Sequence, residues 1–175
     1  SSAYDSLVAD TRNRRVRCIM TKYEFAIPTR ADAVYIAANL KDNNRKELFC
    51  AIGDNALDDI LGGIEHSVEV GCLRIDGVPS AVYGVRKPSI ISDDGRVWLL
   101  MTREMDNHRV FVGRYTKKAV KGLLERYSRL YNWVNVGNDE IIRWLKWLGA
   151  KIHEPEPYGI YGLPHHFFEF RKDDE

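Results

Sequence analysis

The sequence predicts an α/β domain built on a mixed sheet. Three observations point to this fold class. They are a hairpin centred on residues 76–77, a strand–helix–strand unit over residues 97–136, and a capped amphipathic helix that begins at residue 138. With 175 residues, of which 45% are hydrophobic, the chain is long enough to bury one core. We therefore expect a single domain over residues 16–175.

The first fifteen residues are polar and end in arginines, at Arg12, Arg14 and Arg15. Such a run is typical either of an arm that binds nucleic acid or of a solvated segment before the first strand. Because the formal net charge is only +1, the composition as a whole does not favour nucleic acid. We expect residues 1–15 to form a flexible basic segment, and we do not expect nucleic acid as a partner.

One strand and a group of helices are expected before residue 67. Residues 16–25 are typical of a strand, and residues 31–40 show helical spacing, with Thr29 as the N-cap. Two short helices follow, over residues 46–52 and 57–64. We expect them to end at glycines, the second at the Gly62-Gly63 pair, because glycine favours a chain break.

The clearest hairpin lies at residues 68–85. Apolar runs over residues 68–75 and 78–85 flank Asp76-Gly77, a dipeptide that readily adopts positive φ. Residues 97–101 form a continuous apolar strand, which is typical of a strand that is covered on both faces. We expect this strand at the centre of the sheet.

A long amphipathic helix connects the central strand to the next one. Apolar residues recur at helical spacing from residue 112 to residue 127, while Lys117, Lys118 and Lys121 fall outside that face. Further strands are expected over residues 131–136 and 166–170. The strand–helix–strand order predicts a parallel crossover.

Residues 131–150 hold the most specific local pattern: a strand, an Asn, an amphipathic helix and a Gly. We expect the Asn138 side chain to accept a hydrogen bond from the free amides of the first helical turn. Gly149 supplies the left-handed stop at the other end. Trp144 lies on the apolar face of this helix, whereas Trp147 lies off it and indicates a partner surface.

This stretch, together with YGIYGLPHHFFEF at residues 158–170, resembles the GNAT acetyltransferases and, more narrowly, the small GNAT-like proteins of T7-type bacteriophages. Some of those phage proteins are described as acetyltransferases, and others as internal virion or assembly proteins. The resemblance is good from about residue 109 to residue 170, weaker from residue 60 to residue 100, and absent before residue 60. It implies a central, mostly antiparallel sheet with one parallel crossover and with helices on both faces.

The resemblance also implies a reaction. GNAT enzymes transfer an acetyl group directly from acetyl-CoA, as co-substrate, to a small-molecule or protein amine. The thioester carbonyl needs a donor on the central strand, and the pyrophosphate needs the free amides of a helix N-terminus. The cofactor-binding residues implied in this way are Leu99, Leu100 and Met101 on the strand, Arg109, Gly113 and Arg114 on the long helix, and Asn138.

Two positions depart from the family pattern. Phe111 stands where the family places the first Gly of the pyrophosphate loop, and a ring there hinders the approach of an anion to the backbone. Arg109 and Arg114 either compensate by binding phosphate or lie solvated on the helix. Leu145 stands where many members carry the Tyr that protonates the leaving thiolate.

The residues just before the hairpin are the catalytic candidates. The resemblance places substrate-facing groups at Glu65, His66 and Ser67, where a carboxylate or an imidazole accepts the proton of the amine. An exposed pair at a helix end is the alternative interpretation of Glu65 and His66. Ser67 has the alternative role of ending or capping that helix.

No metal site is expected. His165 and His166 are adjacent on a strand and point to opposite faces, so they do not share one ion. We expect His166 to be buried and hydrogen-bonded. Cys18, Cys50 and Cys72 are odd in number and form no CxxC pair, which favours a reducing cytoplasm over a disulfide framework or a structural zinc.

Two functions remain open. The first is a phage-encoded GNAT-type N-acetyltransferase, which the core around Asn138 and Gly149 favours. The second is a non-catalytic virion, assembly or host-interaction protein of the same fold, which the departures at Phe111 and Leu145 favour. Either would act in the cytoplasm of an infected host cell or in the virion, with a phage or host protein as a partner. No apolar run approaches the length of a membrane span.

Overall fold

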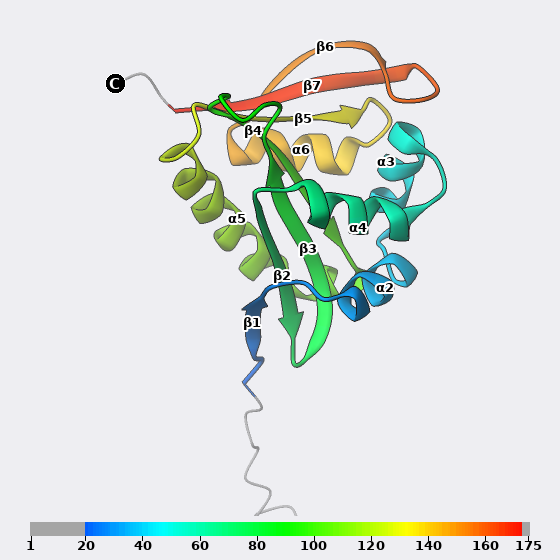
Figure 1. The fold of residues 1–175 in the computed structure, drawn as a ribbon, viewed down its shortest axis with the longest axis vertical. Helices are drawn as coiled ribbons and strands as arrows, with labels where there is room; N and C mark the ends of the chain where they lie inside the picture. The colour runs from blue at the N-terminus through cyan, green and yellow to red at the C-terminus, as the bar shows by residue number, and fades with distance from the viewer. Residues whose placement is uncertain (1–19, 173–175) are drawn as a thin grey trace, which may run out of the picture.

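The computed structural model describes residues 20–172, which share one seven-stranded sheet of order β1-β2-β3-β4-β5-β7-β6 (Figure 1). Every neighbouring pair of strands is antiparallel except β4 and β5, which are parallel. The mixed sheet and its single parallel crossover are therefore confirmed. The basic segment 1–15 and Cys18 lie outside the described residues.

In chain order the elements are β1 (Tyr23–Ala26), α2 (Arg30–Ala38), α3 (Asp42–Ile52), α4 (Ala56–His66), β2 (Glu69–Ile75), β3 (Val78–Arg86), β4 (Asp94–Met101), the 3-10 helix η1 (Arg103–His108), α5 (Arg109–Leu124), β5 (Arg129–Asn135), α6 (Asp139–Leu148), β6 (Lys151–Tyr158) and β7 (Leu163–Arg171).

One face of the sheet is covered by α2 and α4. Ile36 of α2 and Ile60 of α4 are fully buried against Val82 and Leu100 of the central strands. Thr29 caps α2 as predicted, because its hydroxyl accepts a bond from the amide of Asp32 while the Asp32 carboxylate accepts one from the amide of Thr29. The first strand is shorter than predicted: β1 begins at Tyr23, and residues 20–22 are not in a strand.

The expected helix break at Gly62-Gly63 is wrong, because α4 continues through both glycines to His66. Gly63 lies against the indole of Trp98, where a Cβ would come within 3.0 Å of the ring. The glycine therefore allows a close approach between α4 and β4, and it does not end the helix.

The hairpin of β2 and β3 has the predicted turn, with φ of 50° at Asp76 and 82° at Gly77. The central position of β4 between β3 and β5 is confirmed as well.

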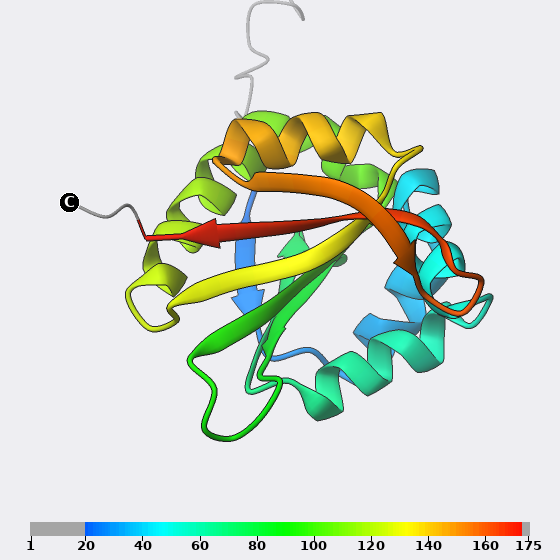
Figure 2. The ribbon, with the colours of Figure 1, turned by 90° about the horizontal axis from the view of Figure 1, so that it is seen from above.

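The opposite face is covered by α5 and α6, which lie together on one side of the sheet (Figures 1 and 2). Their apolar residues pack on Leu130 and Val134 of β5 and on Phe168 and Phe170 of β7. Helices therefore lie on both faces, as expected.

Two elements were not predicted. η1 precedes α5, and β6 forms the edge of the sheet beside β7. β6 carries Pro155 and Pro157, which remove two backbone donors, and its register shifts between Ile152 and Pro155. An edge strand tolerates both features, because only one of its sides is hydrogen-bonded.

Candidate functional site

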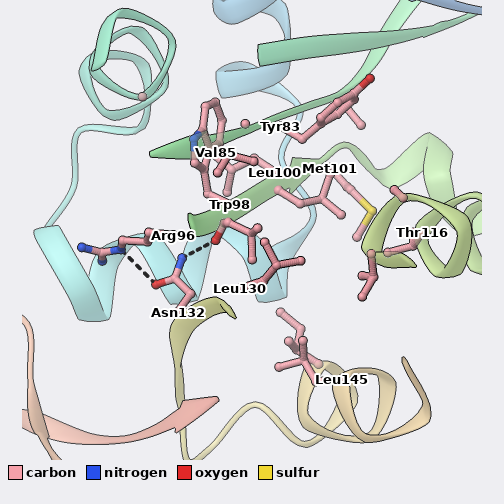
Figure 3. A pocket seen from close by; sticks show the side chains of 18 of the residues that line it. Tyr83, Val85, Arg96, Trp98, Leu100, Met101, Thr116, Leu130, Asn132 and Leu145 are labelled. Carbon is pink, nitrogen blue, oxygen red and sulfur yellow. Dashed lines mark hydrogen bonds between the residues drawn. The ribbon is translucent and has the colours of Figure 1, made fainter. Parts of the chain in front are cut away.

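The strands β4 and β5 separate in the middle of the sheet. They pair only where residues 94–96 of β4 meet residues 129–131 of β5. Beyond that point a cavity of about 760 Å³ opens between them. Its wall is mostly apolar, and Figure 3 shows Leu100, Leu130 and Leu145 pointing into it. Leu145, at the position expected for a general acid, thus contributes only an alkyl chain.

The alternation of hydrogen bonds along β4 decides which of its peptide groups face this gap. The amide of Thr102 donates to the Ser80 carbonyl at 2.9 Å, so Thr102 faces β3. In an antiparallel pair this direction alternates, so the peptide of Leu100 also faces β3. The peptides of Leu99 and Met101 face the gap.

Side-chain and backbone groups near the start of α3 bind the Met101 peptide. The amide of Met101 donates to Oδ1 of Asn44 at 3.0 Å, and its carbonyl accepts from the amide of Lys41 at 2.9 Å. Asn44 is itself buried. The Met101 amide, an expected partner for a thioester carbonyl, is therefore already bonded within the chain.

Asn132 bridges the two strands at the point where they part. Its Nδ2 donates to the Val97 carbonyl at 2.6 Å, and its Oδ1 accepts from Nε of Arg96 at 3.3 Å (Figure 3). The same Oδ1 accepts from the amide of Trp133 at 2.8 Å. One side chain thus replaces ladder bonds that the separated strands cannot make to each other.

Glu47 of α3 performs the same task on the far side of the gap. Its carboxylate accepts from the amide of Asn135 at 3.1 and 3.2 Å and from Nδ2 of Asn138 at 2.9 Å. Burial raises the pKa of the Glu47 carboxyl, against the opposing effect of the bonds from Asn138 and Asn135.

The predicted side-chain cap at Asn138 is wrong. The Asn138 side chain makes no bond to the first turn of α6, because it is turned toward α3. There its Nδ2 donates to Glu47 and, at 3.4 Å, to the Asn43 carbonyl. Gly149 does end the helix in the predicted left-handed conformation, with φ of 98°. The amide implied for a cofactor contact is buried and bonded to α3.

The position expected for a pyrophosphate lies where η1 meets α5. Phe111 packs there against the edge strand, with its ring stacked on Tyr23 at a centroid distance of 3.7 Å and an interplanar angle of 4°. The bulky residue thus anchors the start of α5 to β1. Gly113 lies against the Trp147 ring, where a Cβ would come within 3.3 Å.

The charges at this helix start are balanced. Arg109 lies 3.9 Å from both Asp106 and Glu140, and Lys41 lies 2.6 Å from Asp106 and 3.7 Å from Glu140. A pyrophosphate needs excess positive charge, and two carboxylates offset it here. Arg114 is exposed one turn further along α5, at a smaller cavity of about 420 Å³.

The catalytic candidates separate in the structure. Glu65 and His66 are exposed at the end of α4, and Nδ1 of His66 lies 2.8 Å from the Gly62 carbonyl. Ser67 accepts a bond from Nε1 of Trp98 at 2.8 Å, so it positions an indole in the cavity wall. The cavity is lined by a different residue of α4, the carboxylate Asp59, and not by Glu65 or His66.

Two polar residues at the cavity were not expected there from the sequence, although His165 was considered for a metal site. One is Asp59, whose Oδ2 is buried without a hydrogen-bond partner in the described chain, and burial raises the pKa of its carboxyl. The other is His165, which is 1% exposed. Its Nδ1 donates to the Leu163 carbonyl at 2.7 Å, and its Nε2 is buried with no partner among residues 20–172.

The expectation that His166 is the buried histidine needs correction. His166 is only half-buried and its Nδ1 lies 2.7 Å from the His153 carbonyl, whereas His165 faces the interior. The adjacent pair predicted opposite faces but did not indicate which face is buried.

In the described part of the chain, no three His, Cys, Asp or Glu side chains gather as a metal site, and no helix is long and apolar enough to cross a membrane.

Sequence comparison connects the chain with bacteriophage proteins. Residues 74–156 match the family described as bacteriophage T7, probable scaffold protein Gp13. The chain is 32% identical over 114 residues to the probable scaffold protein gp13 of Escherichia phage T7, a stretch that covers 62% of this chain and 79% of that protein.

Structural comparison connects the chain with acetyltransferases. Spermidine N-acetyltransferase from Vibrio cholerae, in complex with CoA and spermine, has a TM-score of 0.61 at 13% identity, covering 85% of this chain and 95% of that one. The protein yncA from Salmonella typhimurium, with its cofactor acetyl-CoA, has a TM-score of 0.62 at 15% identity, covering 88% and 96%. These likenesses show the GNAT fold.

Proposed function

Since the chain belongs to the family of the bacteriophage T7 probable scaffold protein Gp13 and has the GNAT fold, we propose that it is a phage assembly protein without acetyltransferase activity. The observation that carries this proposal is the bonding inside the gap between β4 and β5. Side chains of α3 and β5 bind the Met101 amide and the Val97 carbonyl, two of the β4 peptide groups that face the gap.

The cost of breaking the hydrogen bonds inside the gap supports this proposal. An acetyl-CoA lying along β4 would compete with Asn44 for the Met101 amide and with Asn132 for the Val97 carbonyl. It would also displace Glu47, which holds Asn135 and Asn138. Each intramolecular bond contributes about 1 kcal/mol, and a buried donor left unpaired costs about 1–3 kcal/mol.

The start of α5 supports it independently. Phe111 is stacked against β1 and is not free to turn aside without breaking that contact. The carboxylates of Asp106 and Glu140 lie close to Arg109 and Lys41, so these two cations are already offset by two carboxylates where a diphosphate would bind.

The acetyltransferase remains the second candidate because of the cavity itself. A space of about 760 Å³ lies between the separated strands, and the Leu99 peptide faces it. An active enzyme would bind acetyl-CoA there and transfer the acetyl group to an amine acceptor.

Calorimetric titration of acetyl-CoA into the purified protein distinguishes the two. We expect no binding by the wild type. We expect measurable binding by the double variant Asn44→Ala/Phe111→Gly, which frees the Met101 amide and the start of α5. The Vibrio cholerae spermidine N-acetyltransferase serves as the positive control.

Micromolar binding by the wild type, about −8 kcal/mol, would contradict the proposal and support the enzyme. Acetylation of spermidine or of a peptide amine by the wild type would contradict it as well. Circular dichroism spectra of both proteins check that the double variant is folded, so that its result reports on the site.

A further inference from the structure

The outer side of α5 carries a row of basic residues. Arg114, Lys117, Lys118 and Lys121 follow the i, i+3, i+4, i+7 spacing of one helix face, and all four are exposed. The helix contains no Asp or Glu from Arg109 to Leu124. We call these four residues, together with Arg143 and Lys146 of α6, the basic face.

The cations of the basic face differ from several arginines of the molecule that are paired. Arg74, Arg126 and Arg129 each lie within 3.0 Å of a carboxylate oxygen. Within residues 20–172, none of the six cations of the basic face forms an ion pair with a carboxylate. Arg30, Arg45, Arg86 and Arg96 form no such ion pair either, but on α5 four unpaired cations share one helix face that carries no carboxylate.

Trp147 lies beside Lys117 of this surface. Its side chain is 53% exposed, although an indole ring carries a large apolar area. The ring lies against Gly113 of α5, and Nζ of Lys117 is 4.2 Å from its centroid. An exposed Trp beside basic residues is typical of the centre of a protein interface.

The two helices lie side by side, so they present one continuous surface. Arg109 approaches Glu140 at the start of both helices, and Gly113 meets Trp147 further along. Figure 2 shows α6 alongside α5 on the same side of the sheet. Arg114 and Lys121 are separated by about 10 Å along the axis of α5, a length that a short peptide segment covers.

We propose that the basic face and Trp147 form a docking surface for an acidic segment of another protein. Carboxylates of the segment would pair with the cations, and an apolar side chain would cover the exposed part of the indole. The inference rests on the proposed function in that it takes the partner to be a protein of phage assembly.

The contact between Lys117 and Trp147 favours a peptide over nucleic acid. A base that stacks on an aromatic ring needs a free face of the ring. The Lys117 ammonium group already covers one face of Trp147. The same ammonium group stays available for a carboxylate, which approaches it from the solvent side.

The test is fluorescence anisotropy with a labelled peptide that combines Glu residues with Leu at helical spacing. We expect saturable binding that weakens at least tenfold when NaCl is raised from about 50 to about 200 mM. A peptide of the same length with Gln in place of Glu should not bind. The triple variant Lys117→Glu/Lys118→Glu/Lys121→Glu should lose at least tenfold in affinity.

The matched control is Arg30→Glu/Lys151→Glu/Lys172→Glu, which makes the same change in net charge at exposed positions outside the basic face. It should bind like the wild type apart from a small general effect. Acrylamide quenching of the wild type, compared with that of Trp147→Phe, should show that the peptide shields Trp147.

Equal losses in the two triple variants would overturn the inference, as would unshielded Trp147 in the saturated complex. Tighter binding of a single-stranded thymidine oligonucleotide than of the acidic peptide would assign the surface to nucleic acid instead. If the charge reversals unfold the chain, the Lys→Gln versions replace them. The acetyl-CoA titration tests whether a ligand binds in the gap, whereas the peptide experiment tests binding to the basic face. Failure of one proposal is therefore distinguishable from failure of the other.

Discussion

Polar groups are bonded within the chain in the gap between β4 and β5, whereas the cations of the basic face on α5 and α6 have no carboxylate partner among the described residues. Inside the gap, Asn44, Glu47 and Asn132 bind the peptide groups of the separated strands. On the basic face, no described carboxylate pairs with the cations. Most buried polar groups find a partner within the chain, whereas exposed ones are solvated. The proposed function rests on the bonding inside the gap, and the proposed docking surface rests on the unpaired cations outside it.

Substitution of Glu47 should have the largest effect on stability and tests the role of the bonds inside the gap. Replacing Glu47 with Ala leaves the Asn135 amide and the Asn138 side chain without their acceptor, so we expect a loss of about 3 kcal/mol in the free energy of unfolding. Glu47→Gln keeps one acceptor oxygen and should lose about 1 kcal/mol. Urea denaturation at neutral pH measures both.

Equal effects of the two Glu47 substitutions would mean that the charge, and not the hydrogen bonding, matters at this position. A negligible effect of both would mean that the bonds from α3 to β5 and Asn138 contribute little to stability. In that case the bonding inside the gap would no longer argue against a cofactor.

Arg74, unlike the cations of the basic face, has a buried carboxylate partner, Asp32. Hydrogen bonds from Arg74, against the opposing effect of burial, lower the pKa of Asp32 to about 2 from its ordinary value of 3.8. Because the pKa is lower in the folded state, the stabilisation is fully present above about pH 4 and is lost as the pH falls through about 2. We expect it to be about 2 kcal/mol.

Denaturation curves from pH 5 down to about pH 1 test this prediction, because this range brackets both pKa values. Asp32→Asn should be less stable than the wild type at neutral pH, and the difference should shrink as the pH falls through that window. A difference that stays constant down to the lowest pH would assign the loss to packing or to the cap at Thr29.

The basic face should respond least to substitution. Lys118→Glu places a carboxylate four residues after Arg114 and relieves repulsion among neighbouring cations. We expect a gain of about 0.3 kcal/mol at low salt, which disappears at about 1 M NaCl because of screening. Urea denaturation at the two salt concentrations measures it, with Lys151→Glu as the control. A loss of more than 1 kcal/mol would show that Lys118 has a structural partner.

Local patterns predicted much of the fold. The Asp76-Gly77 turn, the Thr29 cap and the Gly149 stop each depend on neighbours within a few residues, and all three are confirmed. The edge strand β6 was not predictable in the same way. Its prolines disfavour a strand locally, and its pairing with β7 decides its conformation.

The candidate site shows the same division. The departures at Phe111 and Leu145 are visible in the sequence, and the structure gives them partners, Tyr23 for the former and the apolar cavity for the latter. Asn138 was misjudged because its acceptor, Glu47, lies 91 residues away along the chain. No local rule predicts that an Asn at a helix start will prefer such a partner to the adjacent amides.

The sequence by itself determined the order of the elements apart from η1 and β6, the hairpin and the parallel crossover. These features follow from periodicity, glycine and capping chemistry, whose range is a few residues, whereas the departures at Phe111 and Leu145 are visible only against the family pattern. The tertiary structure alone decided which groups bond inside the gap and which cations remain unpaired. Both depend on contacts between distant segments, such as Asn44 with Met101 across 57 residues, because buried hydrogen-bonding groups are satisfied by whatever the fold brings near them.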